Sequence, residues 1–249
     1  MVENAFDAEV DLGTAESDWL SADWSIPGLH WSDVVTMVVV APHPDDEVLG
    51  VGGLLSMAAA AGVDVRVVAV TDGDGSHPGS PTVSAEDLRA LRPVESERAL
   101  AELGIVQSPT RLQFTDGEVE RHEDALARAL VPLLDATPGT WCLTPWRGDG
   151  HPDHEATARA CLTAAAVVGI PVVEYPIWMW HWATPEHRAV PWSRSRRIDL
   201  PAHAVEAKRA SIERFESQIR PLSDHPADRA VLPPHILTRF RRPFEVVFA

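Results

Sequence analysis

The stretch VVVAPHPDDEVLGVGG, residues 38–53, joins an apolar run to a cluster of ionisable side chains. The apolar run, TMVVVAP at 36–42, is typical of a strand buried on both faces of a sheet. Four polar residues follow it closely, namely His43, Asp45, Asp46 and Glu47. Charges beside a buried strand cost free energy unless they are paired, bound to a metal or used in chemistry. The stretch therefore predicts a functional site at the end of a strand.

Strand-like and helix-like segments alternate along the chain after residue 35. Strands are expected at 36–42, 63–71, 110–114, 140–146, 171–178, 194–200 and 244–248. Helical patterns lie at 50–62, 84–103, 123–135, 154–169 and 203–218. This alternation predicts an α/β fold whose mainly parallel sheet is covered by helices. The ligand crevice of such a sheet lies beyond the carboxyl ends of its strands, where residues 43–47 are expected.

The composition is that of an ordinary globular protein with an acidic balance. The 249 residues are 45% hydrophobic and 23% charged, and their formal net charge is −16. A field of this sign repels nucleic acid and anionic membranes, so a neutral or cationic small-molecule substrate is expected. No apolar run approaches the roughly 18 residues of a membrane span, and the N-terminus lacks a signal-peptide pattern. The sequence thus predicts a cytoplasmic protein without membrane insertion.

Two regions are expected along the chain. Residues 1–34 are acidic and aperiodic, and we expect them to form an N-terminal extension that wraps the surface, held by Trp19, Trp24 and Trp31. Residues 35–249 carry the alternating pattern and are expected to form one domain. The two cysteines of the chain, at 142 and 161, are expected to be buried free thiols.

A second polar motif, GDGHPDHEAT at 148–157, has the same placement as the first. It follows the strand-like run at 140–146 and leads into a helix. It supplies His151, Asp153 and His154. Because the carboxyl ends of parallel strands lie at one edge of a sheet, the two motifs are expected to face the same crevice.

Together the two motifs contain the residue types of a catalytic metal site. His43, Asp46 and one of the later histidines make a set of two histidines and one carboxylate. Three protein ligands with a fourth position left for water form the usual catalytic zinc site, and the pKa of that water falls to about 7. Asp45, which neighbours a ligand, is then available as a base.

Three other interpretations compete with this one. Each motif alone fits a polar turn that caps a helix, but two such motifs, each after a strand and before a helix, favour a shared metal site. The same triad binds ferrous iron in oxygenases, although those sites usually lie in a β-barrel. A non-catalytic sugar-binding or regulatory protein of the same fold is the main alternative, and we would expect it to lack the base or a ligand.

PHPDDE at 42–47, followed downstream by HPDH at 151–154, resembles the LmbE-like, or PIG-L, deacetylase family. The similarity covers about residues 35–220. Weaker signals within it are VTDGDGS at 70–76, Arg92 with Glu95, LG at 103–104, DG at 116–117, and Lys208 with Phe215, Ser217 and Gln218. The resemblance implies a Rossmann-like three-layer sandwich. It also implies an enzyme with one zinc ion per chain, which removes an acetyl or other acyl group from an N-acylated amino sugar or its conjugate.

The resemblance also implies a role for each matching position. The zinc ligands would be His43, Asp46 and His154. Asp45 would be the general base that deprotonates the zinc-bound water, His151 would stabilise the oxyanion of the tetrahedral intermediate, and Asp153 would orient His151 or a ligand. Some members carry a tyrosine two positions before the first histidine of the second motif, where this chain has Asp149.

His151 is expected to act as an imidazolium. The neighbouring carboxylates of Asp149 and Asp153 favour the charged form and would raise its pKa above the usual value of about 6.5. A nearby zinc ion would oppose them, and we expect the carboxylates to dominate. On this basis the basic limb of a bell-shaped pH–rate profile would belong to His151.

Four residues are predicted to contact the substrate, namely Asp72, Arg92, Asp116 and Trp178. Asp72 and Asp116 follow the second and third strands, on the same side of the sheet as the two motifs. Trp178, Trp180 and Trp182 alternate, and alternate residues of a strand share one face, on which indole rings could stack against a sugar. The competing interpretations are a solvated turn for Asp72, an ion pair with Glu95 for Arg92, and a core edge or oligomer contact for the tryptophans.

Overall fold

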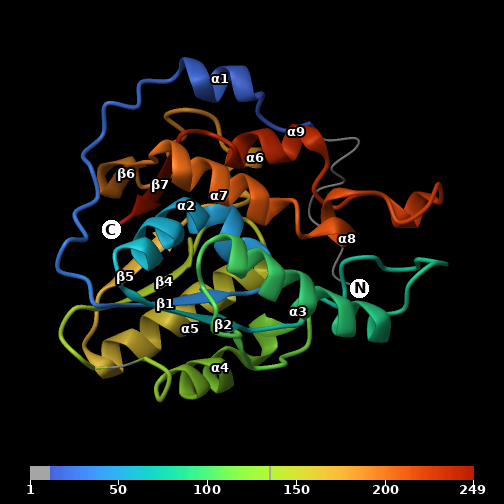
Figure 1. The fold of residues 1–249 in the computed structure, drawn as a ribbon, viewed down its shortest axis with the longest axis horizontal. Coiled ribbons are helices and arrows are strands. Elements are labelled where there is room, and N and C mark those ends of the chain that lie inside the picture. Colours follow the sequence, from blue (N-terminus) through green and yellow to red (C-terminus); the bar gives the residue numbers. More distant parts are fainter. Residues whose placement is uncertain (1–11, 135) are drawn as a thin grey trace.

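The structure, a computed structural model, describes residues 12–134 and 136–249. Its centre is a sheet in the order β3-β2-β1-β4-β5-β7-β6 (Figure 1). The strands are β1 Thr36–Ala41, β2 Asp64–Ala69, β3 Thr110–Arg111, β4 Thr140–Pro145, β5 Val172–Tyr175, β6 Ser195–Asp199 and β7 Phe244–Phe248. Neighbours among β1 to β5 are parallel, and β7 is antiparallel to both β5 and β6. The predicted α/β fold with a mainly parallel sheet is confirmed.

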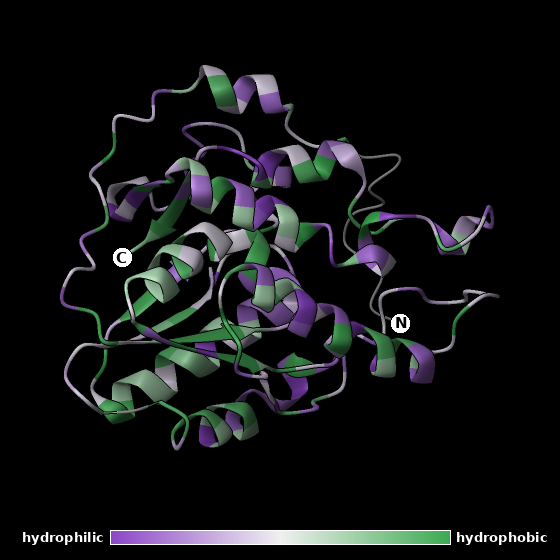
Figure 2. Ribbon diagram, in the orientation of Figure 1, coloured by the Kyte–Doolittle hydropathy of each residue, from purple (hydrophilic) through white to green (hydrophobic). Residues whose placement is uncertain are grey.

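Helices cover both faces of the sheet, which gives the three layers. The long helices are α2 Asp46–Ala60, α3 Ala85–Glu102, α4 Glu123–Leu130, α5 Pro152–Val168 and α7 Ala202–Ile212. In Figure 1, α2, α3 and α7 lie on one side of the sheet and α4 and α5 on the other. Every residue of β1 is buried, and the central strands are hydrophobic in Figure 2. Val39 packs into the core on the α2 side, while Val38 and Val40 pack on the α5 side.

The two polar motifs leave the two strands at which the strand order reverses. From β1 the chain moves outward through β2 to β3, and then returns to add β4 and β5 on the other side. β1 and β4 are paired directly, with Val39 opposite Leu143. Such a switch point opens a crevice beyond the carboxyl ends of the strands. The turn at 43–47 and the loop at 146–151 therefore begin side by side.

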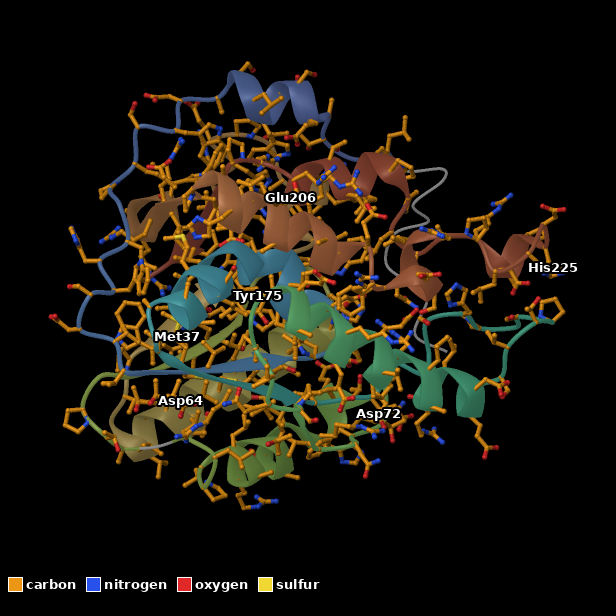
Figure 3. All side chains as sticks on the ribbon, viewed as in Figure 1. Met37, Asp64, Asp72, Tyr175, Glu206 and His225 are labelled. Carbon is orange, nitrogen blue, oxygen red and sulfur yellow. The ribbon has the colours of Figure 1, made fainter. Side chains whose placement is uncertain are left out.

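Helix α2 approaches the sheet closely because residue 50 has no side chain. A Cβ on Gly50 would lie 2.2 Å from the ring of Tyr175, which is labelled close to α2 in Figure 3. The Tyr175 hydroxyl donates a hydrogen bond to the carbonyl of Val40 at 3.0 Å. The tyrosine thus joins β5, β1 and the helix that carries the first motif.

A buried ion pair holds a break in α2. Val51 has non-helical backbone angles, φ −136° and ψ 17°. Lys208 donates to the carbonyl of Leu49 at 2.8 Å and to Glu245 at 2.6 Å, and the Glu245 carboxylate accepts the N–H of Gly53 at 2.7 Å. These side chains satisfy backbone groups that the broken helix leaves unpaired.

The predicted elements are largely confirmed, and the exceptions lie in the last third of the chain. The strand predicted at 171–178 ends at Tyr175, and the tryptophans that follow belong to a short helix. The helix predicted at 203–218 is two helices, because the chain turns at Phe215. The short helices are α1 Glu16–Ser21, α6 Met179–Trp182, α8 Glu216–Ile219 and α9 Pro234–Leu237, with 3₁₀ turns at Val119–His122, Trp192–Arg194, Pro226–Asp228 and Thr238–Phe240. The expected edge strand near residue 197 is β6.

The N-terminal segment from residue 12 to residue 34, called the brace below, lies against the last third of the chain. Trp19 is fully buried, and its indole N–H donates to the carbonyl of Trp180 at 3.0 Å. Glu16 accepts two hydrogen bonds from Arg242, at 2.8 and 2.6 Å. The expected role of Trp19 in holding this segment is confirmed, whereas residues 1–11 of the predicted extension lie outside the described residues.

Two sequence-based expectations concern the core and the membrane. Cys142 and Cys161 are both buried and free, as expected. None of the helices within residues 12–134 and 136–249 combines the length and the apolar character that crossing a bilayer requires.

Candidate metal centre

His43, Asp46 and His154 converge at the carboxyl ends of β1 and β4. One carboxylate oxygen, Oδ2 of Asp46, lies 3.3 Å from Nδ1 of His43 and 3.3 Å from Nε2 of His154. The three ligand atoms lie within 4.8 Å of one another. Metal–nitrogen and metal–oxygen bonds of about 2.0–2.1 Å in a tetrahedral zinc site imply ligand separations of about 3.3–3.4 Å. The spacing therefore suits a small tetrahedral ion.

The other nitrogen of each histidine faces a carboxylate. Nε2 of His43 lies 3.1 Å from Asp116 and 3.3 Å from Asp153, and Nδ1 of His154 lies 2.8 Å from Asp149. Metal-binding histidines usually donate their remaining N–H in this way, which fixes the ring and its tautomer. Nε2 of His154 is buried and makes no hydrogen bond of good geometry within the described part of the chain. The donor set and this buried nitrogen fit a metal ligand.

The charges at the cluster are mutually dependent. Burial would raise the pKa of Asp46, but His154 and His43 outweigh it and hold that pKa well below its usual range. Burial would lower the pKa of His154, but Asp46 and Asp149 outweigh it and raise the pKa to about 9. Asp46 is therefore anionic, while His154 holds a proton that a metal must displace. Metal binding at this cluster should consequently tighten as the pH rises.

Asp45 lies at the pocket in a strained conformation. Its φ is 140°, in a region that costs a non-glycine residue about 1–3 kcal/mol. Arg92 holds this turn, because it donates to the Asp45 carboxylate at 3.0 Å, to the Pro44 carbonyl at 2.8 Å and to the Gly73 carbonyl at 2.7 Å. Burial raises the pKa of Asp45 to about 7, against the opposing charge of Arg92. Arg92, a predicted substrate contact, lines the pocket but is buried and bound to Asp45, and not to Glu95.

Asp153 connects the two motifs with the loop after β3. Its carboxylate accepts the N–H groups of Gly117 at 2.7 Å and Val119 at 3.1 Å, and it lies 3.3 Å from Nε2 of His43. Its contacts are those of a residue that orients His43 and the loop at 117–119. The structure places Asp153 at the site, next to Nε2 of His43, whereas Asp46 lies next to Nδ1 of the same ring.

The surroundings of His151 favour a neutral ring over the expected imidazolium. Burial lowers its pKa to about 3, and the positive charges of His154 and His43 act in the same direction, so the acidic neighbours are outweighed. Nδ1 of His151 accepts the N–H of Asp153 at 3.2 Å, in the capping position of α5. The proton of the neutral ring is therefore on Nε2. A neutral His151 can still donate one hydrogen bond from that nitrogen.

The four predicted substrate contacts have different environments. Asp116 lines the pocket, but it also accepts the N–H of Gly75 at 2.8 Å and faces His43. Asp72 does not line this pocket; it forms two hydrogen bonds with Arg111, both at 2.7 Å, near the end of β2 (Figure 3). Trp178 lines the pocket, as expected of a substrate contact. It lies in the turn before α6, however, and not on the predicted strand.

The pocket above the cluster is lined by both polar and apolar residues. Its empty volume is about 560 Å³, which includes some open solvent. The polar lining includes Ser76 and Gln218 beside the site residues. The apolar lining consists of Leu49, Ile177, Trp178, Val231 and Leu232. Sequence reasoning missed Val231 and Leu232, because they come from an irregular segment with no pattern of its own.

The sequence marked Asp149 only as a departure from a tyrosine pattern and as a charge near His151, yet it is part of the site. It is fully buried, and it hydrogen-bonds Nδ1 of His154 at 2.8 Å. The same carboxylate accepts the N–H groups of Ile177, Trp178 and Met179 at 2.8, 2.9 and 3.0 Å. The available signal was a carboxylate five residues before a candidate histidine ligand, within a glycine-rich loop.

Comparisons with known proteins show which proteins this chain is similar to. The chain is 31% identical over 144 residues to a diacetylchitobiose deacetylase from Thermococcus kodakarensis, a match that covers 57% of this chain and 53% of that relative. It thus spans about half the length of that protein. The solved structure of the A40926 pseudoaglycone deacetylase Dbv21 superposes with a TM-score of 0.62, at 24% identity, over 86% of this chain and 96% of that one.

The fold alone does not determine the chemistry, because function resides in the site that a fold carries. The 4-carboxy-2-hydroxymuconate hydratase GalB from Pseudomonas putida KT2440 superposes with a TM-score of 0.54, at 17% identity, over 74% of this chain and 79% of that one. The sequence profile of the GlcNAc-PI de-N-acetylase family, PIG-L, matches residues 38–165, about half of the chain and both polar motifs. The chain belongs to the PIG-L family.

Proposed function

We propose that the protein is a zinc-dependent N-deacetylase that removes an acetyl or other acyl group from an N-acylated amino sugar or its conjugate. One observation carries the proposal. Two histidines and a carboxylate with tetrahedral spacing lie beside a buried carboxylate, Asp45, that is not part of their cluster. Membership of a family named for a de-N-acetylase supports the reaction. A cytoplasmic location is part of the proposal and rests on the sequence alone.

The residues of the pocket would divide the reaction among them. His43, Asp46 and His154 would hold the ion. A bound Zn²⁺ would polarise the substrate carbonyl and lower the pKa of a coordinated water to about 7. Asp45 would accept a proton from the attacking water and pass it to the leaving amine, while His151 would donate from Nε2 to the carbonyl oxygen as its negative charge develops.

The pocket suits a substrate that has both polar and apolar parts. Ser76 and Gln218 can hydrogen-bond sugar hydroxyls, while Ile177 and Trp178 offer an apolar surface. The main alternative, a non-catalytic protein of the same fold, predicts a missing base or ligand, and this chain retains both. The ferrous-iron alternative expects a β-barrel, whereas the sheet is open and mainly parallel.

The proposal is tested by the release of free amine from a panel of N-acylated substrates. The panel contains N-acetylglucosamine, diacetylchitobiose, alkyl N-acetylglucosaminides and N-acyl glycopeptides. We expect zinc-dependent amine release from at least one of them, and loss of that release when the metal is chelated. Stoichiometric zinc binding without amine release from any member would favour the non-catalytic alternative.

The role of His151 is tested by His151→Asn. Asparagine is a good capping residue, so it can replace the acceptor for the Asp153 N–H while it removes the imidazole donor. We expect kcat to fall about 10²–10³-fold with zinc still bound. Because burial and the positive charge around His151 lower its pKa, the basic limb of the pH–rate profile should stay where it is. A basic limb that disappears in the variant would restore the imidazolium interpretation.

A further inference from the structure

Asp149 bonds to a candidate metal ligand and to the wall of the pocket at once. Its carboxylate has no exposed surface. Oδ2 bonds Nδ1 of His154 and the N–H of Trp178, and Oδ1 bonds the N–H groups of Ile177 and Met179, all within 3.0 Å. Nε2, the other ring nitrogen of His154, lies 3.3 Å from Oδ2 of Asp46. One side chain thus joins the metal cluster to the turn before α6.

The backbone around Asp149 is fixed to the same turn. The indole N–H of Trp182 donates to the Asp149 carbonyl at 2.7 Å. The next residue, Gly150, has φ 90°, and a Cβ there would lie 2.8 Å from the nitrogen of that indole. The loop at 148–150 therefore has little room to move without the helix that carries Trp182.

We propose that Asp149 is a positioning residue that couples metal binding to the order of residues 177–179. An ion held by Nε2 of His154 fixes the imidazole ring, the ring fixes the carboxylate, and the carboxylate fixes three backbone amides. Ile177 and Trp178 line the pocket, so the ion orders the surface that receives the substrate. Since coupling is reciprocal, a molecule bound on that surface tightens metal binding. The inference rests on the metal site of the proposed function.

The first test needs neither a variant nor a substrate. Amide hydrogen exchange at residues 177–179 is measured in the wild-type chain with and without zinc alone, with α4 on the far face of the sheet as an internal reference. We expect zinc to slow exchange at these three amides at least about 10-fold, as ordering of a local segment implies, and to leave α4 unchanged. Zinc binding without this effect would overturn the coupling.

The second test is Asp149→Asn, which keeps the shape of the side chain. The amide nitrogen cannot accept a hydrogen bond, so it opposes either the N–H groups of Trp178 and His154 or those of Ile177 and Met179. Loss of such a partner usually weakens metal affinity about 10–100-fold, and we expect this loss in a chelator competition, together with loss of the zinc effect on exchange.

Glu174→Gln is the matched control for Asp149→Asn. Glu174 is equally buried and lies on β5, and its carboxylate binds Arg147 and Arg194 rather than the site. The Glu174→Gln variant should keep the zinc affinity of the wild type. Wild-type zinc affinity and exchange in Asp149→Asn would overturn the role of Asp149. If the wild type bound no zinc, this inference and the proposed function would both fail, whereas normal coupling without amine release would refute only the proposed activity.

Discussion

Asp45→Asn is expected to lower kcat by about 10²–10⁴-fold, the usual contribution of a general base, while zinc stays bound. Asparagine has the same shape, and its oxygen can still accept the hydrogen bond from Arg92, so the strained turn is retained. What it loses is the ability to accept a proton. Metal content and kcat, measured on the same preparation, separate these two effects.

The pH dependence identifies the same group. The base must be ionised, so activity is lost as the pH falls through the pKa of Asp45. Burial raises that pKa to about 7, and the positive charge of a bound ion acts in the opposite direction. We therefore expect the acidic limb of the profile below about pH 7 in the wild type, and its absence from the residual activity of the variant.

A surface carboxylate provides the control for Asp45. Asp64 lies on β2 and pairs with Arg66 away from the pocket, so Asp64→Asn should keep the wild-type kcat. Near-normal turnover by zinc-loaded Asp45→Asn would remove Asp45 from the mechanism. A neighbouring carboxylate of the pocket, such as Asp116, would then have to supply the base.

The double variant His43→Ala/His154→Ala is expected to lose the metal and the activity together. Wild-type protein should retain about one zinc ion per chain after dialysis, and the variant less than about a tenth of that, because only one of three protein ligands remains. Zinc should raise the melting temperature of the wild type, as any ligand of the native state does, and leave that of the variant unchanged. Elemental analysis and thermal unfolding measure both effects.

Loss of structure must be distinguished from loss of metal. Removing both rings leaves the buried carboxylates of Asp46 and Asp149 without their imidazole partners, and breaking a buried ion pair costs about 3–5 kcal/mol. His43→Gln alone keeps an amide donor in the pocket and should fold. The control His203→Ala/His225→Ala removes two exposed histidines and should keep the zinc. Full zinc occupancy in the ligand double variant would refute the assignment of the site.

The parts of the site that sequence reasoning located are those encoded within a few residues. His43 and Asp46 lie in one turn, and His151 and His154 open one helix, so each motif and the strand before it could be recognised together. The order of the strands could not be predicted in this way, because it depends on packing between segments far apart in the chain. The convergence of the motifs was therefore an expectation until the pairing of β1 with β4 was known.

The errors have a physical cause in tertiary contacts. The alternating tryptophans at 178–182 suggested a strand, but Asp149 accepts the amides of residues 177–179, which favours a helical turn that local sequence does not indicate. The charge expected for His151 rested on its acidic neighbours in sequence, whereas burial, the largest influence on its pKa, comes from the folded site. Asp72 was assigned to the pocket because the sequence gives no sign of its hydrogen bonds with Arg111, which lies on another strand.

The brace described above has a consequence for how the protein is made. Glu16 and its partner Arg242 are 226 positions apart, so at about 5–20 residues per second the ribosome needs about 10–45 s to synthesise the second after the first. Throughout that time Trp19 lacks the guanidinium of Arg242, which lies over its ring in the folded protein, and for most of it Trp19 also lacks its hydrogen-bond acceptor on Trp180. The tryptophan-rich brace therefore stays unburied in the nascent chain until Arg242 has been synthesised, and release of the chain before β7 would leave the brace exposed to proteases and to aggregation.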